Sequence, residues 1–117
     1  MDKTMVMKIL DQKKIKMIKH VVCFKIKEEC KNRIEEARKT LLSMREHVPN
    51  IIKLNVGIDL LHSQRSYDII LEVVLESMEY LSIYQEDLYH CTVVKPLMHE
   101  IRCASVAVDF EVDECDI

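Results

Sequence analysis

Two kinds of hydrophobic periodicity alternate along this chain of 117 residues, and their order constrains the fold more than any single residue does. Apolar residues at every second position are typical of strands, and apolar residues three or four positions apart are typical of amphipathic helices. The strand-like segments are residues 18–26, 52–59, 67–75 and 101–111, and the helix-like segments are residues 28–48 and 77–91. The order along the chain is therefore strand, helix, strand, strand, helix, strand.

This order is that of a split βαβ, or ferredoxin-like, unit. It predicts an α+β sandwich of the type βαββαβ, in which a four-stranded antiparallel sheet carries both helices on one face. Some strands are apolar on both faces, most clearly at Val21 with Cys23 and at Ile70 with Val74. An uncovered sheet of this kind would expose a large apolar patch, which marks an interaction surface. We therefore expect a homodimer in which two sheets pack face to face.

The chain is long enough for one domain with one core. Residues 1–16 are rich in Lys and Met and have no clear period, so they are expected to form an extension. That extension is either flexible or weakly helical, or a short element that caps a neighbouring subunit. The domain itself is predicted to span residues 17–111, and residues 112–117 to be a solvated acidic tail. The single glycine, Gly57, indicates a bulge or a close approach within its strand.

Composition argues against several classes of partner. The net charge is −3 and there is no Trp, so the chain offers neither a basic field nor stacking platforms for nucleic acid. No segment reaches the roughly 18 to 20 apolar residues of a membrane span, and no apolar leader is apparent. The five cysteines are odd in number and include no C-x-x-C pair. They are expected to be reduced thiols in the cytoplasm rather than zinc ligands or disulfides.

A series of short motifs resembles the stress-responsive A/B barrel (Dabb) family of the dimeric α/β barrel superfamily. The motifs lie between Met17 and Glu111, in the order that the family has. They are Ile18-Lys19-His20-Val21-Val22, Val48-Pro49-Asn50-Ile51, Asn55-Val56-Gly57, Tyr67-Asp68-Ile69-Ile70-Leu71, Glu76-Ser77, the Tyr84 to His90 block and Val108-Asp109-Phe110. The resemblance implies a homodimeric barrel with the helices outside and no cofactor.

The resemblance also implies a site. Some members are similar to a plant polyketide cyclase that closes poly-β-ketone chains into rings by aldol chemistry, with a histidine as base and a tyrosine assisting. The usual block is Y-x-x-H-P-x-H, and this chain keeps its first and last residues as Tyr84 and His90. The middle His-Pro is replaced by Asp87-Leu88. Losing the proline removes a forced break, so the helix is expected to run further.

The residues themselves support three catalytic candidates, His90, Tyr84 and His20. A neutral imidazole at His90 can remove a proton next to a ketone, and Tyr84 can donate to the resulting enolate oxygen. The two lie six positions apart, so a bend is needed for both to face one cavity. Each also has a structural interpretation. Tyr84 would be a core anchor and His90 a cap on a helix end.

His20 lies on the apolar strand face with Val22 and Phe24. It is either a second polar wall of the cavity or a buried histidine bonded to a partner. Asp109 is a candidate partner, because the last strand can neighbour the first, and such a pair would fix the imidazole tautomer. Asp109 could equally face solvent.

The expected ligand-binding residues are Val22, Phe24, Leu71, Leu81 and Asp109. No spacing indicates a metal site, and His47, His62 and His99 are expected to be solvent residues near element ends. Two functions remain open. The first is a homodimer that binds a small apolar or carbonyl-containing molecule without turnover. The second is a cofactor-independent enzyme acting on an enolisable carbonyl compound.

Overall fold

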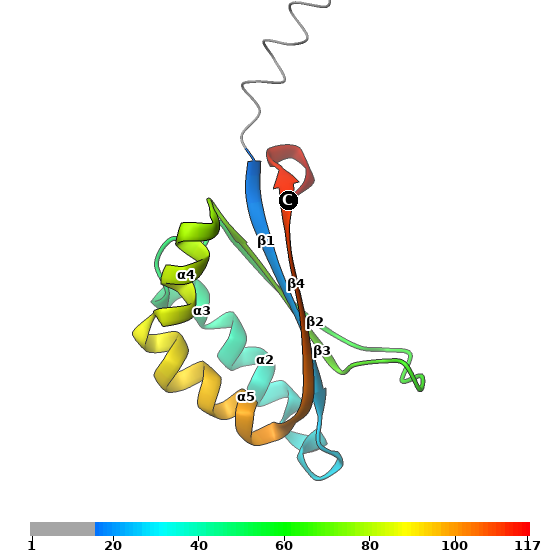
Figure 1. The fold of residues 1–117 in the computed structure, drawn as a ribbon. Helices are drawn as coiled ribbons and strands as arrows, with labels where there is room; N and C mark the ends of the chain where they lie inside the picture. The colour runs from blue at the N-terminus through cyan, green and yellow to red at the C-terminus, as the bar shows by residue number, and fades with distance from the viewer. Residues whose placement is uncertain (1–15) are drawn as a thin grey trace, which may run out of the picture.

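The computed structural model describes residues 16–117, which form a sheet covered on one face by helices (Figure 1). The strands are β1 (Lys16–Ile26), β2 (Lys53–Ile58), β3 (Ile69–Leu75) and β4 (Arg102–Asp113). The first helical segment is made of η1 (Glu28–Arg33), α2 (Ile34–Leu42) and α3 (Met44–His47). The second is made of α4 (Met78–Glu86), a π-helical turn η2 (His90–Val94) and α5 (Lys95–Ile101), and η3 (Glu114–Asp116) follows β4. This succession confirms the predicted order of elements.

The strands pair antiparallel in the order β2-β3-β1-β4, which is the predicted ferredoxin-like topology. β1 therefore lies inside the sheet, between β3 and β4. In this register His20 is directly opposite Val73 on one side and Asp109 on the other. Because side chains alternate across a strand, His20, Val22 and Phe24 share the face that the helices cover.

The core lies between that covered face and the helices. Leu41 and Met44 from the first helical segment, Val73 from β3, and Tyr84 and Ile101 from the second segment are all buried. Each large apolar side chain that is buried in this way contributes about 1.5–3 kcal/mol. The period-three-and-four stripes of the sequence are thus the faces that hold the helices on the sheet.

The opposite face of the sheet, which we call the open face, carries apolar side chains that remain exposed. On β4, Val106 is 50% exposed, Val108 is 61% exposed and Phe110 is 43% exposed. Their partners on β1 are Cys23, Val21 and Lys19, and the Lys19 ammonium lies 3.0 Å from the Glu72 carboxylate of β3. The sequence prediction of an apolar second face is confirmed.

The sequence predicts either a bulge or a close approach at Gly57, and the structure shows the close approach. A Cβ atom there would lie 2.9 Å from Cγ2 of Ile70, its partner across the β2–β3 pair, so the residue marks a close approach. No register shift occurs at Gly57, and the shift in the β1–β4 pair lies instead opposite Lys25 and Ile26, where Cys103 of β4 has no partner. Glycine is present because a side chain would collide with the neighbouring strand.

The sequence makes one prediction for each end of the chain, an N-terminal extension and a C-terminal tail. The predicted extension, residues 1–16, lies outside the described residues except for Lys16, which is part of β1. The predicted solvated tail is corrected, because β4 continues through Val112 and Asp113 opposite Met17 and Lys16. Val112 and Asp113 prolong the ladder, since β1 extends far enough to pair with them.

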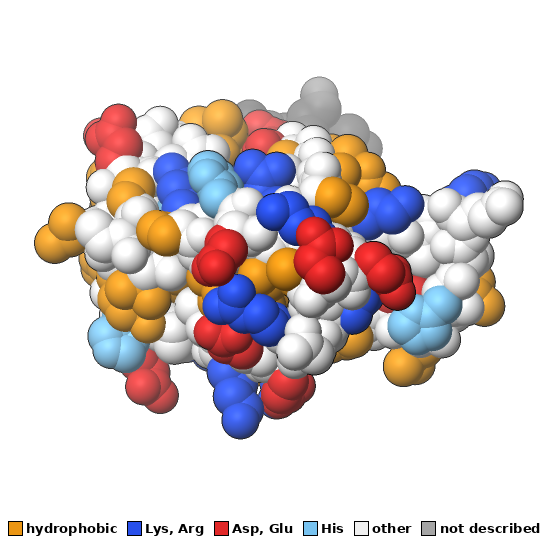
Figure 2. Space-filling view, turned by 90° about the horizontal axis from the view of Figure 1, so that it is seen from below, with side chains coloured by type: hydrophobic (Ala, Val, Ile, Leu, Met, Phe, Trp, Pro, Cys, Tyr) orange, Lys and Arg blue, Asp and Glu red, His pale blue; other side chains and the backbone are white. Residues whose placement is uncertain are grey.

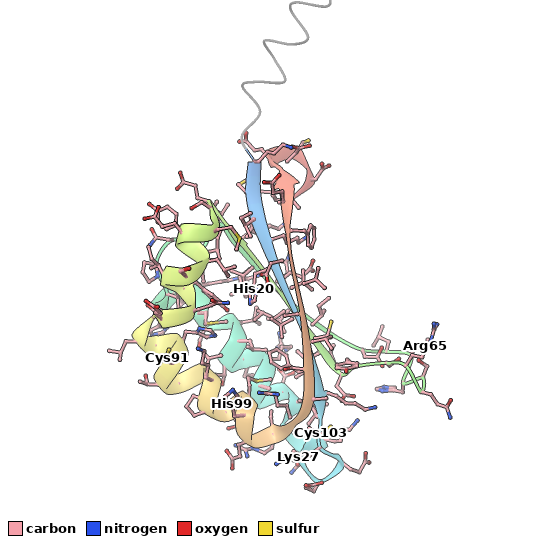
Figure 3. The ribbon with its side chains drawn as sticks, in the orientation of Figure 1. His20, Lys27, Arg65, Cys91, His99 and Cys103 are labelled. Atoms are coloured by element: carbon pink, nitrogen blue, oxygen red, sulfur yellow. The ribbon has the colours of Figure 1, made fainter. Side chains whose placement is uncertain are left out.

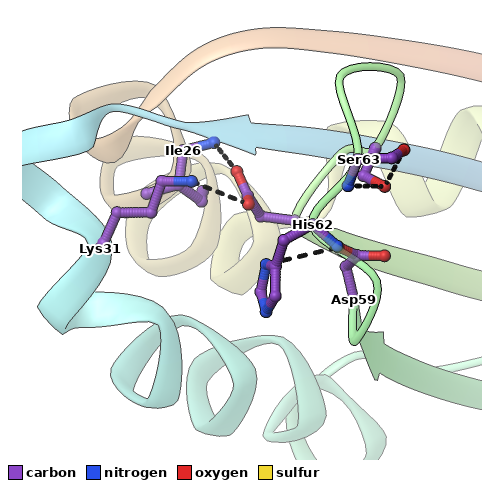
Figure 4. A network of polar contacts seen from close by, with 7 residues as sticks. Ile26, Lys31, Asp59, His62 and Ser63 are labelled. Carbon is purple, nitrogen blue, oxygen red and sulfur yellow. Dashed lines mark hydrogen bonds and ion pairs between the residues drawn. The ribbon is translucent and has the colours of Figure 1, made fainter.

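Asp68 ties the beginning of β3 to the end of β1 (Figure 4). Its carboxylate is buried and accepts hydrogen bonds from the Ile26 backbone N–H at 2.7 Å and from Lys31 Nζ at 3.0 Å. Burial acts to raise the pKa of Asp68, but the bonds from Ile26 and Lys31 outweigh it and hold that pKa below its usual range. Among residues 16–117, no helix combines the length and apolarity needed to cross a membrane.

Candidate functional site

A cavity of about 280 Å³ lies between the helices and the covered face of the sheet. Its floor is formed by His20, Val22 and Phe24 of β1, together with Leu71 of β3. The second helical segment forms its wall. Three of the five predicted ligand-binding residues, Val22, Phe24 and Leu71, therefore line one cavity. The space is at the small end of the range for ligand sites.

His20 is held on the floor by its partner on the edge strand. Its Nδ1 atom is hydrogen-bonded to Oδ1 of Asp109, which lies directly opposite on β4. This confirms the interpretation of Asp109 as the partner carboxylate of His20. Because an ionised carboxylate only accepts, Nδ1 is the donor, and in the neutral form of the ring Nε2 is the unprotonated atom. Asp109 positions His20 but does not itself line the cavity.

The break between Tyr84 and His90 is maintained without proline, contrary to the sequence expectation of a longer helix. α4 ends at Glu86, and Asp87 has an extended backbone with ψ of 136°. The Asp87 carboxylate accepts from the His90 backbone N–H at 3.0 Å, and its carbonyl oxygen accepts from the Cys91 N–H at 2.9 Å. Asp87 therefore caps a new helical turn, a role for which aspartate is well suited.

This break, followed by the π-helical turn, brings Tyr84 and His90 together. Their ring centroids are 4.5 Å apart, with an angle of 29° between the planes. His90 Nδ1 lies 3.1 Å from the backbone carbonyl oxygen of Tyr84. Since a carbonyl only accepts, Nδ1 is the donor and Nε2 is unprotonated in the neutral ring. His90 thus caps a carbonyl near the end of α4 and also lines the cavity.

Burial is the main reason that the pKa of His90 lies below its ordinary value. The positive charge of Lys95 and the nearby His20 lower the pKa further, while the Tyr84 carbonyl and Asp87 act in the opposite direction. His90 is therefore a neutral imidazole near pH 7. In this state its Nε2 atom can accept a proton.

Tyr84 contributes its ring rather than its hydroxyl group. The hydroxyl donates to the Met44 sulfur at 3.7 Å, within the core. Burial raises the pKa of Tyr84, and the negative charge of Asp87 adds to this effect. The ring contacts both imidazoles, stacked on His90 and edge-on to His20 at 5.7 Å. The core-anchor interpretation thus describes this residue better than that of a donor to an enolate.

Leu81 is also a core residue, because it is buried on α4 and does not line the cavity. Sequence reasoning did not assign eight other lining residues to the site, among them Lys95, His99 and Arg102. We call the part of the cavity lined by these three residues the mouth. Lys95 and His99 are four positions apart on α5, and this spacing was the available signal, whereas Arg102 is the first residue of β4. His99 is exposed to solvent, as expected from the sequence, and also lines the cavity.

The polar groups around the cavity do not resemble a metal centre. In the described part of the chain, no three side chains of the ligating types His, Cys, Asp and Glu are grouped together. The cavity instead presents two imidazole Nε2 atoms next to apolar walls. Such a set can bind a carbonyl-containing molecule or move a proton on it.

The sheet order and the one-sided helical layer define a protein of the ferredoxin-like α+β class. The family model described as "Stress responsive A/B Barrel Domain" (Dabb) matches residues 18–112. The chain belongs to this family. No curated protein sequence matches the chain closely enough to be a relative.

Solved structures of the same fold include proteins of unknown function and enzymes. A dimeric ferredoxin-like protein from Thermobifida fusca has a TM-score of 0.73 at 19% identity, covering 83% of this chain and 92% of that one. A dimeric protein of unknown function from Bacteroides fragilis has a TM-score of 0.72 at 19% identity, covering 82% and 96%. Hydroxynitrile lyase from Passiflora edulis has a TM-score of 0.71 at 13% identity, covering 84% and 94%. These similarities establish the fold.

Proposed function

We propose that this protein is a homodimer that binds a small apolar or carbonyl-containing molecule in the cavity between helices and sheet. The observation that carries the proposal is the cavity of about 280 Å³ itself, which is partly open to solvent between the helices and the sheet. A space of this size with apolar walls and two imidazoles is therefore a suitable ligand site.

The homodimer is supported by the open face. Val106, Val108 and Phe110 form an exposed apolar strip along β4, beside Val21 and Cys23 of β1. A strip of this kind favours association, and a two-fold arrangement covers the same strip on both subunits. Two of the solved structures with this fold are named as dimeric.

The ligand proposal can be tested with two neutral ketones, 2-octanone and 4-phenyl-2-butanone. We expect at least one of them to raise the melting temperature, because a ligand that binds only the folded state stabilises it. His90→Ala should weaken this effect while the variant remains folded. His62→Ala is the matched control, because His62 lies on the exposed β2–β3 loop. An unchanged shift in His90→Ala would remove His90 from the site, and no shift with either ketone in the wild type would contradict the proposal.

A second candidate function is cofactor-independent proton abstraction next to a carbonyl group. It is favoured by one observation, namely that both His20 and His90 have their Nδ1 atoms occupied by acceptors. Each neutral ring therefore keeps Nε2 as the basic atom. In this proposal His90 removes the proton, His20 assists from its position beside Asp109, and the ring of Tyr84 contacts both imidazoles.

The enzymatic candidate predicts that the protein accelerates exchange of the α-protons of 4-phenyl-2-butanone for deuterium. NMR in D₂O would measure this exchange, with His90→Gln and His62→Gln as the test and control variants. Loss of the acceleration in His90→Gln alone would support the role of His90. A wild-type rate equal to that of the buffer would leave the binding function and exclude this chemistry for the probe.

We also propose the cytoplasm as the location of the protein. All five cysteines are free thiols, and two of them, Cys103 and Cys115, are exposed. Exposed thiols persist where glutathione keeps the environment reducing. Cell fractionation would test this proposal, and recovery of the protein outside the cytoplasmic fraction would contradict it.

A further inference from the structure

We propose that the cavity selects a carboxylate-bearing ligand, whose apolar part lies inside and whose carboxylate is bound at the mouth by Arg102, with Lys95 and His99 beside it. This inference rests on the proposed binding function and adds the chemical class of the ligand. It follows from the unequal distribution of charge around one cavity.

The lining of the cavity contains basic residues but no acidic ones. Lys95, His99 and Arg102 line its mouth, and no aspartate or glutamate contributes to the lining. The chain as a whole has a net charge of −3. Figure 2 views the molecule from below, toward the end where α5 runs into β4, and shows acidic and basic side chains interspersed there. The positive character is therefore a property of the cavity rather than of the surrounding surface.

The acidic side chains nearest in sequence or pairing already have partners. Asp109 is bonded to His20, and the Glu100 carboxylate lies 3.3 Å from Arg33. Asp87 accepts from the His90 backbone. These carboxylates are thus engaged away from the mouth, and an external carboxylate meets little competition for the basic groups.

The basic groups are, by contrast, available. Lys95 Nζ donates to the backbone carbonyl oxygen of Gln85 at 3.0 Å, which positions the ammonium without neutralising it. Arg102 forms no ion pair or side-chain hydrogen bond with any residue of the described range 16–117. It is half-buried at the junction between α5 and β4, next to the register shift that leaves Cys103 without a partner on β1. A partly desolvated guanidinium of this kind binds a carboxylate strongly, with two parallel N–H donors.

The inner part of the cavity fits the apolar portion of such a ligand. Val22 and Phe24 form its floor, and Val94 and Met98 form its wall. Figure 3 shows His20 between the helical layer and the sheet, and His99 further along α5 toward β4. His20 and His90 are buried, Arg102 is half-buried and His99 is exposed, while the ammonium of Lys95 is near enough to His90 to lower the pKa of that imidazole. A molecule bound by its carboxylate at the mouth would extend toward the two imidazoles.

The test compares three probes of equal chain length, namely octanoate, octanamide and 2-octanone, by isothermal titration calorimetry at pH 7.5. We expect octanoate to bind at least about tenfold more tightly than octanamide, because charge-assisted bonds are stronger than neutral ones. Arg102→Gln should reduce this preference to within about twofold, and Arg102→Lys should keep part of it. Arg65→Gln, on the β2–β3 loop labelled in Figure 3, is the matched control and should keep the whole preference.

The outcomes separate the inference from the function on which it rests. Equal binding of octanoate and octanamide would overturn the carboxylate inference and leave the binding function. A preference that survives Arg102→Gln would equally overturn the role of Arg102. Absence of binding by all three probes would overturn both proposals. Circular dichroism of each variant establishes whether it is folded. If Arg102→Gln is unfolded, the octanoate preference of Arg102→Lys decides whether Arg102 binds the carboxylate.

Discussion

The two faces of the sheet are both apolar, yet they differ in the burial and in the partners of their polar residues. On the covered face, the buried polar residues His20 and His90 each have a hydrogen-bond partner, and so does Asp68 at the edge of that layer. The open face has exposed valines around the ion pair of Lys19 with Glu72. The comparison teaches that the polar groups of the covered face find their partners within one chain. The exposed apolar residues of the open face are instead typical of an interface.

The largest effect is expected in the core of the covered face. Leu41→Ala should lower the free energy of unfolding by about 2–5 kcal/mol, since Leu41 is fully buried and its truncation leaves a cavity. Leu60→Ala is the control, because Leu60 is exposed on the β2–β3 loop, and it should change stability by less than about 0.5 kcal/mol. Urea denaturation followed by circular dichroism measures both. Similar losses in the two variants would contradict the assignment of the core.

The next effect concerns the open face. Val108→Glu should raise the dissociation constant of the proposed dimer on the order of 100-fold or more, because a charge is placed in the apolar strip. The matched control is Leu88→Glu, an exposed leucine of the helical layer. Light scattering over a range of concentrations gives the molecular mass. A wild-type monomer at micromolar concentration, or an unaffected Val108→Glu dimer, would refute the assignment of the open face as the interface.

A smaller effect is expected at the edge of the covered layer. Asp68→Asn should cost about 1–3 kcal/mol of stability at pH 7, because it removes a charge that accepts two hydrogen bonds. The pKa of Asp68 is lowered in the folded state, so its contribution is complete above the unfolded value of about 3.9 and is lost as pH falls through the folded value. Denaturation measured from pH 7 to pH 2 should show this loss in the wild type. An equally steep loss in Asp68→Asn would assign it to other carboxylates.

The smallest effect is expected from His90. Its folded pKa is lowered, so the unfolded chain binds more protons than the folded chain below the unfolded value of about 6.5. The stability contribution of neutral His90 is thus complete above that pH and falls as pH drops toward the folded pKa. His90→Gln should flatten the stability profile between pH 7 and pH 5, with His47→Gln as control. A profile that His90→Gln leaves unchanged would show that His90 does not cause this loss.

The fold could be predicted from the sequence because its signals are local and repeated. The alternation in residues 18–26 and the stripes of the two helical segments each specify an element and its inner face. The β1–β4 pairing of His20 with Asp109 also followed, since topology decides which strands are neighbours. Tail residues such as Val112 were less predictable, because their pairing depends on how far β1 extends in the other direction.

The site was less predictable because it depends on where each atom points. Sequence placed Tyr84 at the cavity, but its hydroxyl donates to Met44, which lies 40 positions away. Leu81 shares the stripe of Tyr84 and is nevertheless enclosed by the core. Lys95 and His99 lie on α5 and Arg102 begins β4, so the three residues line one cavity only once α5 is docked on the sheet.

The break at Asp87 has a consequence for how such chains diverge. A bend that a proline enforces through its ring is here held by a carboxylate that accepts the His90 N–H. The bend that precedes His90 therefore does not require a proline in this chain. The letters of a motif can change while the histidine that follows the bend still lines the cavity.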